Sequence, residues 1–88
     1  MPKIEVYSSL FCPYCARAKN LLKKKGAEFL EIDVDQNPEE RFEMEKRANG
    51  STSVPQIFFD GKFVGGSDDL AALEVSGVLD GLLTSKGE

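Results

Sequence analysis

The feature that most restricts the fold of this 88-residue chain is the position of its two cysteines. Cys12 and Cys15 are separated by only two residues, so a disulfide between them would close too small a loop to hold a fold together. The chain, which has room for a single domain over residues 1–88, must therefore rest on a hydrophobic core. The cysteine pair itself must be explained by its chemistry, with two buried structural thiols on a helix as the alternative.

The composition excludes several classes of function. The chain has no histidine, so Cys-His nucleophilic dyads and histidine-containing zinc sites are excluded, and two thiols alone do not complete a four-ligand metal site. Eleven basic against fifteen acidic residues give a net charge of −4, the wrong sign for binding nucleic acid. No apolar run is long enough to span a membrane or to form a signal peptide. We expect a cytoplasmic monomer without a bound metal, and in that compartment a close cysteine pair indicates redox activity.

The first part of the chain carries the pattern of a β-α-β unit. Alternating polar and apolar residues over 3–7 predict a strand, and apolar residues at helical spacing over 13–25 predict a helix that Gly26 ends. A second strand is expected over 29–34. Because a helix connects the two strands, they should pair in parallel through a right-handed crossover.

A second helix is expected to follow this unit. The sequence Asn-Pro-Glu-Glu over 37–40 has the spacing of a capping box, with asparagine as the N-cap, and the helix should end near 49–50. The acidic start and the basic end, which contains Lys46 and Arg47, match the helix dipole. These charges therefore indicate a solvated face and not a docking site.

The second part of the chain predicts a hairpin and a third helix. Strand-forming residues over 56–59 and 62–64 flank Asp60-Gly61, a dipeptide typical of a type I′ turn. Ser67 is placed to cap the helix that follows. Whether a short last helix forms over 78–83 is left undecided, because this segment contains a glycine. The predicted order is β-α-β-α-β-β-α, which defines an α/β fold.

The motif Cys12-Pro13-Tyr14-Cys15 lies directly after the first strand and at the start of the first helix. Free backbone N–H groups and the positive end of the helix dipole stabilise a thiolate at Cys12, which we assign as the nucleophile. Cys15 faces the same side one turn further on and is more enclosed, so we assign it as the resolving thiol. Tyr14 offers an exposed aromatic wall for a ligand.

Val54-Pro55 directly precedes a predicted strand, where a proline cannot donate to the sheet and often marks a special backbone geometry. A cis bond here is a hypothesis. It would present the backbone N–H and C=O groups of Val54 to a bound peptide as a short β-like edge. The alternative is a trans proline that begins an edge strand.

The segment Gly65-Gly66-Ser67-Asp68-Asp69 is the third signal for a ligand. Glycines permit close approach, and the start of a helix binds a carboxylate through its free N–H groups. Asp68 is placed to pair with an amine. A ligand with both a carboxylate and an ammonium group, such as the end of an amino acid, would fit, and a plain helix cap is the alternative.

These three motifs, in this order and at these spacings, resemble the short dithiol class of glutaredoxins over essentially the whole chain. The resemblance implies a thioredoxin-like fold, in which a four-stranded mixed sheet has helices on both faces, and a cis bond before Pro55. It also implies that glutathione lies across a groove, with its sulfur bonded to Cys12 and its cysteinyl backbone paired with Val54. The implied glutathione-binding residues are Tyr14, Ser53, Val54, Pro55, Gly66, Ser67 and Asp68, with Ser67 and Asp68 at the γ-glutamyl end.

The chain departs from the family pattern at Ser9. Many dithiol glutaredoxins resemble one another in a lysine at this position, three residues before the nucleophile and near both the thiolate and a ligand carboxylate. The carboxylate at the glycine end of glutathione usually meets basic side chains. Because this chain has a serine at position 9, the positive charge that a lysine would place near the thiolate and the ligand carboxylate is missing there.

The leading hypothesis is a glutathione-dependent thiol-disulfide oxidoreductase, a thioltransferase that reduces glutathione mixed disulfides and protein disulfides with glutathione as cosubstrate. Its partners would be glutathionylated or disulfide-bonded proteins. One alternative is a thioredoxin-like reductant served by a flavoprotein reductase. Two features count against it: the lack of a tryptophan before Cys12, and the acidic site over 67–69. The other alternative is a dimer that shares a [2Fe–2S] cluster through Cys12 and two glutathiones, which Pro13 disfavours because it stiffens the turn.

Overall fold

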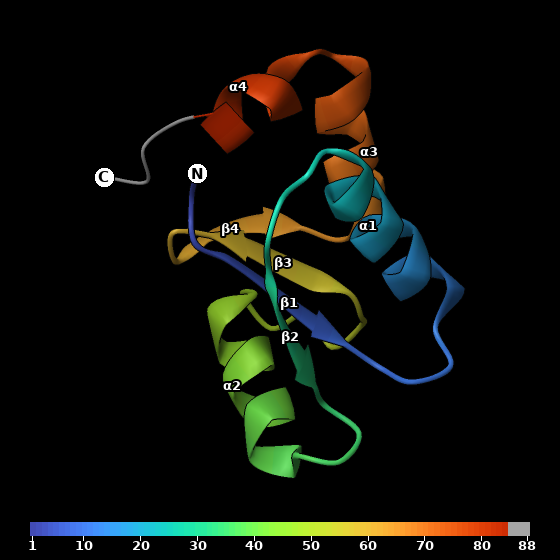
Figure 1. Cartoon of the computed structure of the whole chain (residues 1–88). Coiled ribbons are helices and arrows are strands. Elements are labelled where there is room, and N and C mark those ends of the chain that lie inside the picture. The colour runs from blue at the N-terminus through green and yellow to red at the C-terminus, as the bar shows by residue number, and fades with distance from the viewer. Residues whose placement is uncertain (85–88) are drawn as a thin grey trace.

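The computed structural model describes residues 1–84, which form four strands and four helices (Figure 1). In chain order these are β1 (Ile4–Ser8), α1 (Pro13–Lys24), β2 (Leu30–Asp33), α2 (Pro38–Arg47), β3 (Gln56–Phe59), β4 (Lys62–Gly65), α3 (Ser67–Val75) and α4 (Val78–Thr84). The predicted order of elements is confirmed, and the last helix that the sequence left open is present. No helix within residues 1–84 is both long enough and apolar enough to cross a membrane.

The strands form one mixed sheet in the order β2-β1-β3-β4. Strand β1 pairs in parallel with β2 and antiparallel with β3, and β3 pairs antiparallel with β4. In the turn between β3 and β4, Asp60 has a φ of 53° and Gly61 a φ of 79°. Positive φ at both central residues is what a type I′ turn requires, so the predicted hairpin is confirmed.

Helices pack on both faces of the sheet, with α1, α3 and α4 on one side and α2 on the other (Figure 1). Successive residues of a strand point to opposite faces, so Ile57 belongs to the first core and Phe58 to the second. The first core contains Ile4, Val6, Ala18, Leu22, Ala27, Ile57, Phe59, Leu70, Leu79 and Leu83, and the second contains Tyr7, Val34, Met44, Ala48 and Phe58. The fold class expected from the sequence is confirmed.

The start of α2 differs from the predicted capping box. Asn37 is the N-cap and Pro38 the first helical residue, as expected, but the Asn37 side chain makes no capping hydrogen bond. Its amide Nδ2 instead donates to the carbonyl oxygen of Asp33 at 2.9 Å. The capping-box interpretation is therefore wrong, because the side chain satisfies the end of β2 and not the start of α2.

The start of α3 also differs from the expectation. Gly66 is the N-cap, and Ser67 is already the first residue of the helix. The carboxylate of Asp69 accepts a hydrogen bond from the Gly66 backbone N–H at 2.9 Å. The prediction that Ser67 caps this helix is wrong, since a side chain inside the first turn holds the helix start in place.

The expectation that the charged end of α2 is a solvated face is wrong for Arg47. Its guanidinium makes two hydrogen bonds to the Glu5 carboxylate at 2.9 and 3.1 Å and one to the Tyr7 hydroxyl at 2.8 Å. It also lies over the Phe58 ring, 4.1 Å from the centroid. These hydrogen bonds lower the pKa of Glu5. Arg47 therefore fastens α2 to the sheet, and Lys46 stays exposed.

Candidate active site

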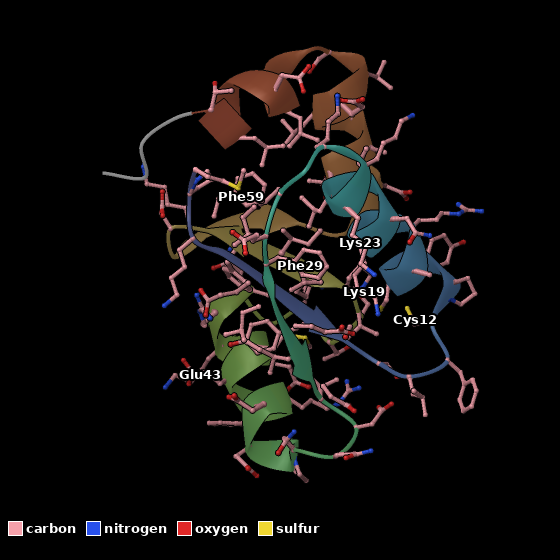
Figure 2. The ribbon with its side chains drawn as sticks, in the orientation of Figure 1. Cys12, Lys19, Lys23, Phe29, Glu43 and Phe59 are labelled. Carbon is pink, nitrogen blue, oxygen red and sulfur yellow. The ribbon has the colours of Figure 1, made fainter. Side chains whose placement is uncertain are left out.

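Cys12 lies at the start of α1, where Figure 2 shows it labelled. It is the N-cap of the helix, and its sulfur accepts a hydrogen bond from the Cys15 backbone N–H at 3.1 Å. The Cys12 thiol in turn donates to the carbonyl oxygen of Val54 at 3.7 Å. A backbone N–H of the first helical turn thus points at the sulfur, at the positive end of the helix dipole. Cys12 therefore lies at the start of the helix, where the sequence predicted it.

Cys15 is buried beneath Cys12, with only 1% of its surface exposed. Burial, together with the hydrogen bond to Cys12, raises the pKa of Cys15 to about 12. A thiolate at Cys15 is therefore rare near neutral pH, whereas Cys12 is partly exposed to solvent. The two thiols differ in access, as the sequence predicted.

A groove with a volume of about 440 Å³ runs beside this pair. It reaches Cys12 through Val54, although neither cysteine lines it. Its lining includes all seven residues predicted to contact glutathione, together with Ser51, Gln56, Phe63 and Asp69, and these come from α1, the segment 51–56, β4 and the start of α3. The structure thus brings the three sequence motifs together at one site.

The peptide bond between Val54 and Pro55 is cis, so the hypothesis is confirmed and the trans alternative is wrong. The Pro55 carbonyl lies against the start of α3: a Cβ atom at Gly66 would come within 3.3 Å of it. Gly65 has a φ of 126°, and a Cβ there would overlap the Asp69 side chain. Gly66 therefore allows the start of α3 to approach the Pro55 carbonyl closely, and Gly65 leaves room for the Asp69 side chain.

Gln56 is a groove residue that sequence analysis missed. Its side-chain amide donates to the Ser53 carbonyl at 2.9 Å and lies 3.2 Å from the Ser53 hydroxyl. Gln56 is only 4% exposed, and its Oε1 has no hydrogen-bond partner among residues 1–84. The signal in the sequence was a polar residue at the start of an otherwise apolar strand. Gln56 holds the backbone that leads into the cis proline.

A second set of missed residues fixes the loop before Cys12. The Ser9 hydroxyl and the Leu10 backbone N–H both donate to the Asp35 carboxylate, at 2.6 and 3.1 Å, and these bonds lower the pKa of Asp35. Arg41 of α2 lies 3.9 Å from Asp35 and donates to the Thr52 carbonyl at 3.1 Å. The Arg41 guanidinium thus contacts the backbone of Thr52, which precedes Val54 by two residues in the chain. No local pattern predicts this, because the residues are far apart in the sequence.

Lys19 is placed one helical turn after Cys15 on α1, and Figure 2 labels it. Its ammonium forms an ion pair of 2.7 Å with Glu31, whose carboxylate also accepts a hydrogen bond of 2.7 Å from the Ser8 hydroxyl. The positive charge of Lys19 favours the Cys15 thiolate, but the effect of burial on the pKa of Cys15 is larger. Cys15 is thus buried with a cation nearby.

The described part of the chain contains no group of three or more histidine, cysteine, aspartate or glutamate side chains arranged to hold a metal ion. The chemistry that this site offers is that of the two thiols and the groove. The site offers a partly exposed thiol at Cys12 and a buried thiol at Cys15, and the groove offers a peptide edge at Val54 and free N–H groups at the start of α3.

Comparisons with known proteins agree with this geometry. The family model described as Glutaredoxin matches residues 4–64. A glutaredoxin of Pseudomonas aeruginosa is 52% identical over 85 residues, which cover 97% of this chain and 100% of the relative. The solution structure of a glutaredoxin from Brucella melitensis is 54% identical with a TM-score of 0.82, over 94% of this chain and 89% of that chain. A buckwheat glutaredoxin-glutathione complex is 30% identical with a TM-score of 0.85, over 94% of this chain and 77% of that chain.

The matched residues include β1, the cysteine pair and the cis proline, which are the parts of the molecule that build the site. The sheet with helices on both faces is the thioredoxin-like fold of the similar structures. Two thiols of unequal burial at the start of α1 provide for redox chemistry. Sequence, fold and site together show that this chain belongs to the glutaredoxin family and has its thiol oxidoreductase role.

Proposed function

We propose that this protein is a glutathione-dependent thiol-disulfide oxidoreductase that reduces glutathione mixed disulfides and protein disulfides. The observation that carries the proposal is the contact of 3.7 Å between the Cys12 sulfur and the Val54 carbonyl, at the edge of the groove. A peptide that pairs with Val54 would hold its own cysteine sulfur beside Cys12. The structure of the similar buckwheat protein, which contains glutathione, supports glutathione as that peptide.

One contact is assigned to each charged part of glutathione, two of them in the groove and one, to Arg41, beside it. The free N–H groups in the first turn of α3, at Ser67 and Asp68, suit the α-carboxylate of the γ-glutamyl end, and the Asp68 carboxylate suits its ammonium group. Tyr14 flanks the sulfur. At the other end, we assign the glycine carboxylate to Arg41, whose guanidinium stands beside the segment that leads to Val54. Arg41 would then provide the charge that Ser9 does not.

Reduction of a glutathione mixed disulfide needs only Cys12. Its thiolate attacks the glutathione sulfur, so that a disulfide forms between Cys12 and glutathione while the protein thiolate leaves. A second glutathione thiolate then attacks the glutathione sulfur held on Cys12. The products are glutathione disulfide and the Cys12 thiolate.

Reduction of a protein disulfide uses both thiols. Cys12 first forms a mixed disulfide with one protein sulfur and releases the other as a thiolate. Cys15 then loses its proton and attacks the Cys12 sulfur, which releases the second protein thiolate and closes the Cys12-Cys15 disulfide. Two glutathiones reduce this bond. The Lys19 ammonium stabilises the charge that appears on Cys15 during this step.

The two alternatives have less support. The site at the start of α3 has free N–H groups and acidic side chains, which suit glutathione. The site therefore favours glutathione, and not a flavoprotein reductase, as the source of electrons. No observation on the described residues favours a cluster-sharing dimer. We propose that the protein acts as a cytoplasmic monomer on glutathionylated and disulfide-bonded proteins.

The test is the turnover of a small glutathione mixed disulfide, coupled to glutathione reductase, with thioredoxin reductase as the comparison. Activity should require glutathione, and Cys12→Ser should abolish it. Cys15→Ser should retain this activity and lose most reduction of a protein disulfide, because the resolving thiol acts at high effective concentration. Turnover supported by thioredoxin reductase alone, or activity in Cys12→Ser, would contradict the proposal.

A further inference from the structure

Two apolar side chains stand exposed directly before the nucleophile. Leu10 is 70% exposed and Phe11 is 93% exposed, and we refer to them as the Leu10-Phe11 patch. The patch lies outside the groove, whose lining contains no residue before Tyr14. Neither side chain belongs to a hydrophobic core. The patch therefore contributes nothing to the packing of the fold and nothing to the groove.

The loop that carries the patch is held in place on both sides. On one side, the Asp35 carboxylate accepts hydrogen bonds from the Ser9 hydroxyl and the Leu10 backbone N–H. On the other side, Cys12 caps α1 with its sulfur. Phe11 is fixed between these two anchors. Its side chain is exposed to solvent, on the residue directly before Cys12.

The geometry of a disulfide determines what comes near this patch. When Cys12 is joined to a substrate cysteine, the two Cα atoms lie about 5.5 Å apart, and the neighbouring residue of each chain is about 3.8 Å further along. A side chain next to the substrate cysteine therefore lies within reach of Phe11. Glutathione has no apolar side chain next to its cysteine, which is flanked by γ-glutamate and glycine, so it would make no such contact.

We propose that the Leu10-Phe11 patch binds an apolar side chain that flanks the attacked cysteine of a polypeptide disulfide, and so selects protein substrates by sequence. The inference rests on the proposed function, since it needs the mixed disulfide between Cys12 and a polypeptide. Burial of part of the Phe11 ring against such a side chain should give a preference of about tenfold in kcat/KM, equivalent to about 1.4 kcal/mol.

The experiment compares two short cyclic peptides, each closed by one disulfide, with leucine or serine on both sides of the cysteines. Their reduction is followed with glutathione and glutathione reductase, and the rate with glutathione alone is subtracted. The protein should prefer the leucine peptide about tenfold, and Phe11→Ala should reduce that preference to less than about threefold. Turnover of a small glutathione mixed disulfide is measured in parallel on the same samples.

Phe42→Ala is the matched control, because Phe42 is another exposed phenylalanine, 66% exposed, that lies on α2. It should keep the full preference. Equal use of both peptides by the unaltered protein, or an unchanged preference in Phe11→Ala, would overturn the inference. If the unaltered protein reduces the small mixed disulfide but shows no peptide preference, only this inference fails. If it reduces neither kind of substrate, the proposed function fails as well.

Discussion

The burial of Cys15 leads to a quantitative prediction for its reactivity. In the Cys12→Ser variant, Cys15 is the only thiol, and the serine hydroxyl is still able to accept the Cys15 backbone N–H. With Cys12 present, burial, which is the largest cause, and the hydrogen bond to Cys12 together raise the pKa of Cys15 from an ordinary 9.0 to about 12, and the variant keeps the burial. Three pH units correspond to about a thousandfold smaller thiolate fraction at pH 7, and only the thiolate is alkylated. We expect Cys15 in the folded variant to react with iodoacetamide up to about a thousandfold more slowly than a free thiol, because its burial remains.

The pH dependence of the alkylation rate tests the cause as well as the size of this effect. A raised pKa means that the folded protein favours the protonated thiol, so the rate should rise about tenfold for each pH unit from 7 to 10 without a plateau. The rate is measured by mass spectrometry at each pH. The same variant unfolded in urea is the control, and its rate should level off near the pKa of a free thiol. A plateau at or below pH 9 in the folded variant would refute the reasoning.

Three further predictions follow from the contacts of the structure. Glu5→Gln should lower the free energy of unfolding by about 2 kcal/mol at pH 7, because it breaks the partly buried pair with Arg47. Since the pKa of Glu5 is lowered by folding from 4.5, this difference in urea-unfolding experiments should be present above pH 4.5 and disappear as the pH falls through the lower pKa of the folded state. Gly66→Ala should raise the KM for glutathione about fivefold, because its Cβ pushes against the Pro55 carbonyl, and an unchanged KM would show that this backbone yields. Ser9→Lys should raise kcat/KM for a small glutathione mixed disulfide by at most about fivefold, and no change at low salt would mean that the position contributes no charge contact.

Much of the fold was predictable from the sequence because its signals are local. The hairpin depended on two residues, Asp60 and Gly61, whose conformational preferences select the turn. The helix starts at Pro13 and Pro38 were correct for the same reason, since proline suits the first helical position. The position of Cys12 at the start of α1 was predictable because Pro13, the next residue, begins the helix.

The errors concern side chains that had a choice of partner. Asn37 was expected to cap its own helix and donates to Asp33 instead, and Ser67 was expected to cap α3, which Gly66 and Asp69 begin. In each case the residue type fitted the cap. Several polar groups compete within one turn, however, and the backbone geometry of the folded loop decides between them.

The sequence by itself determined the order of elements, the position of the cysteine pair at the start of α1 and the three motifs that meet at the groove, because each depends on residues next to one another in the chain. Only the tertiary structure decided that Arg47 pairs with Glu5, and that Arg41 and Asp35 meet beside the loop before Cys12. Long charged side chains find their partners through space, on elements that lie far apart in the sequence. The burial of Cys15 beneath Cys12 likewise depends on the packing of α1 against the sheet, which makes the two neighbouring thiols chemically unequal.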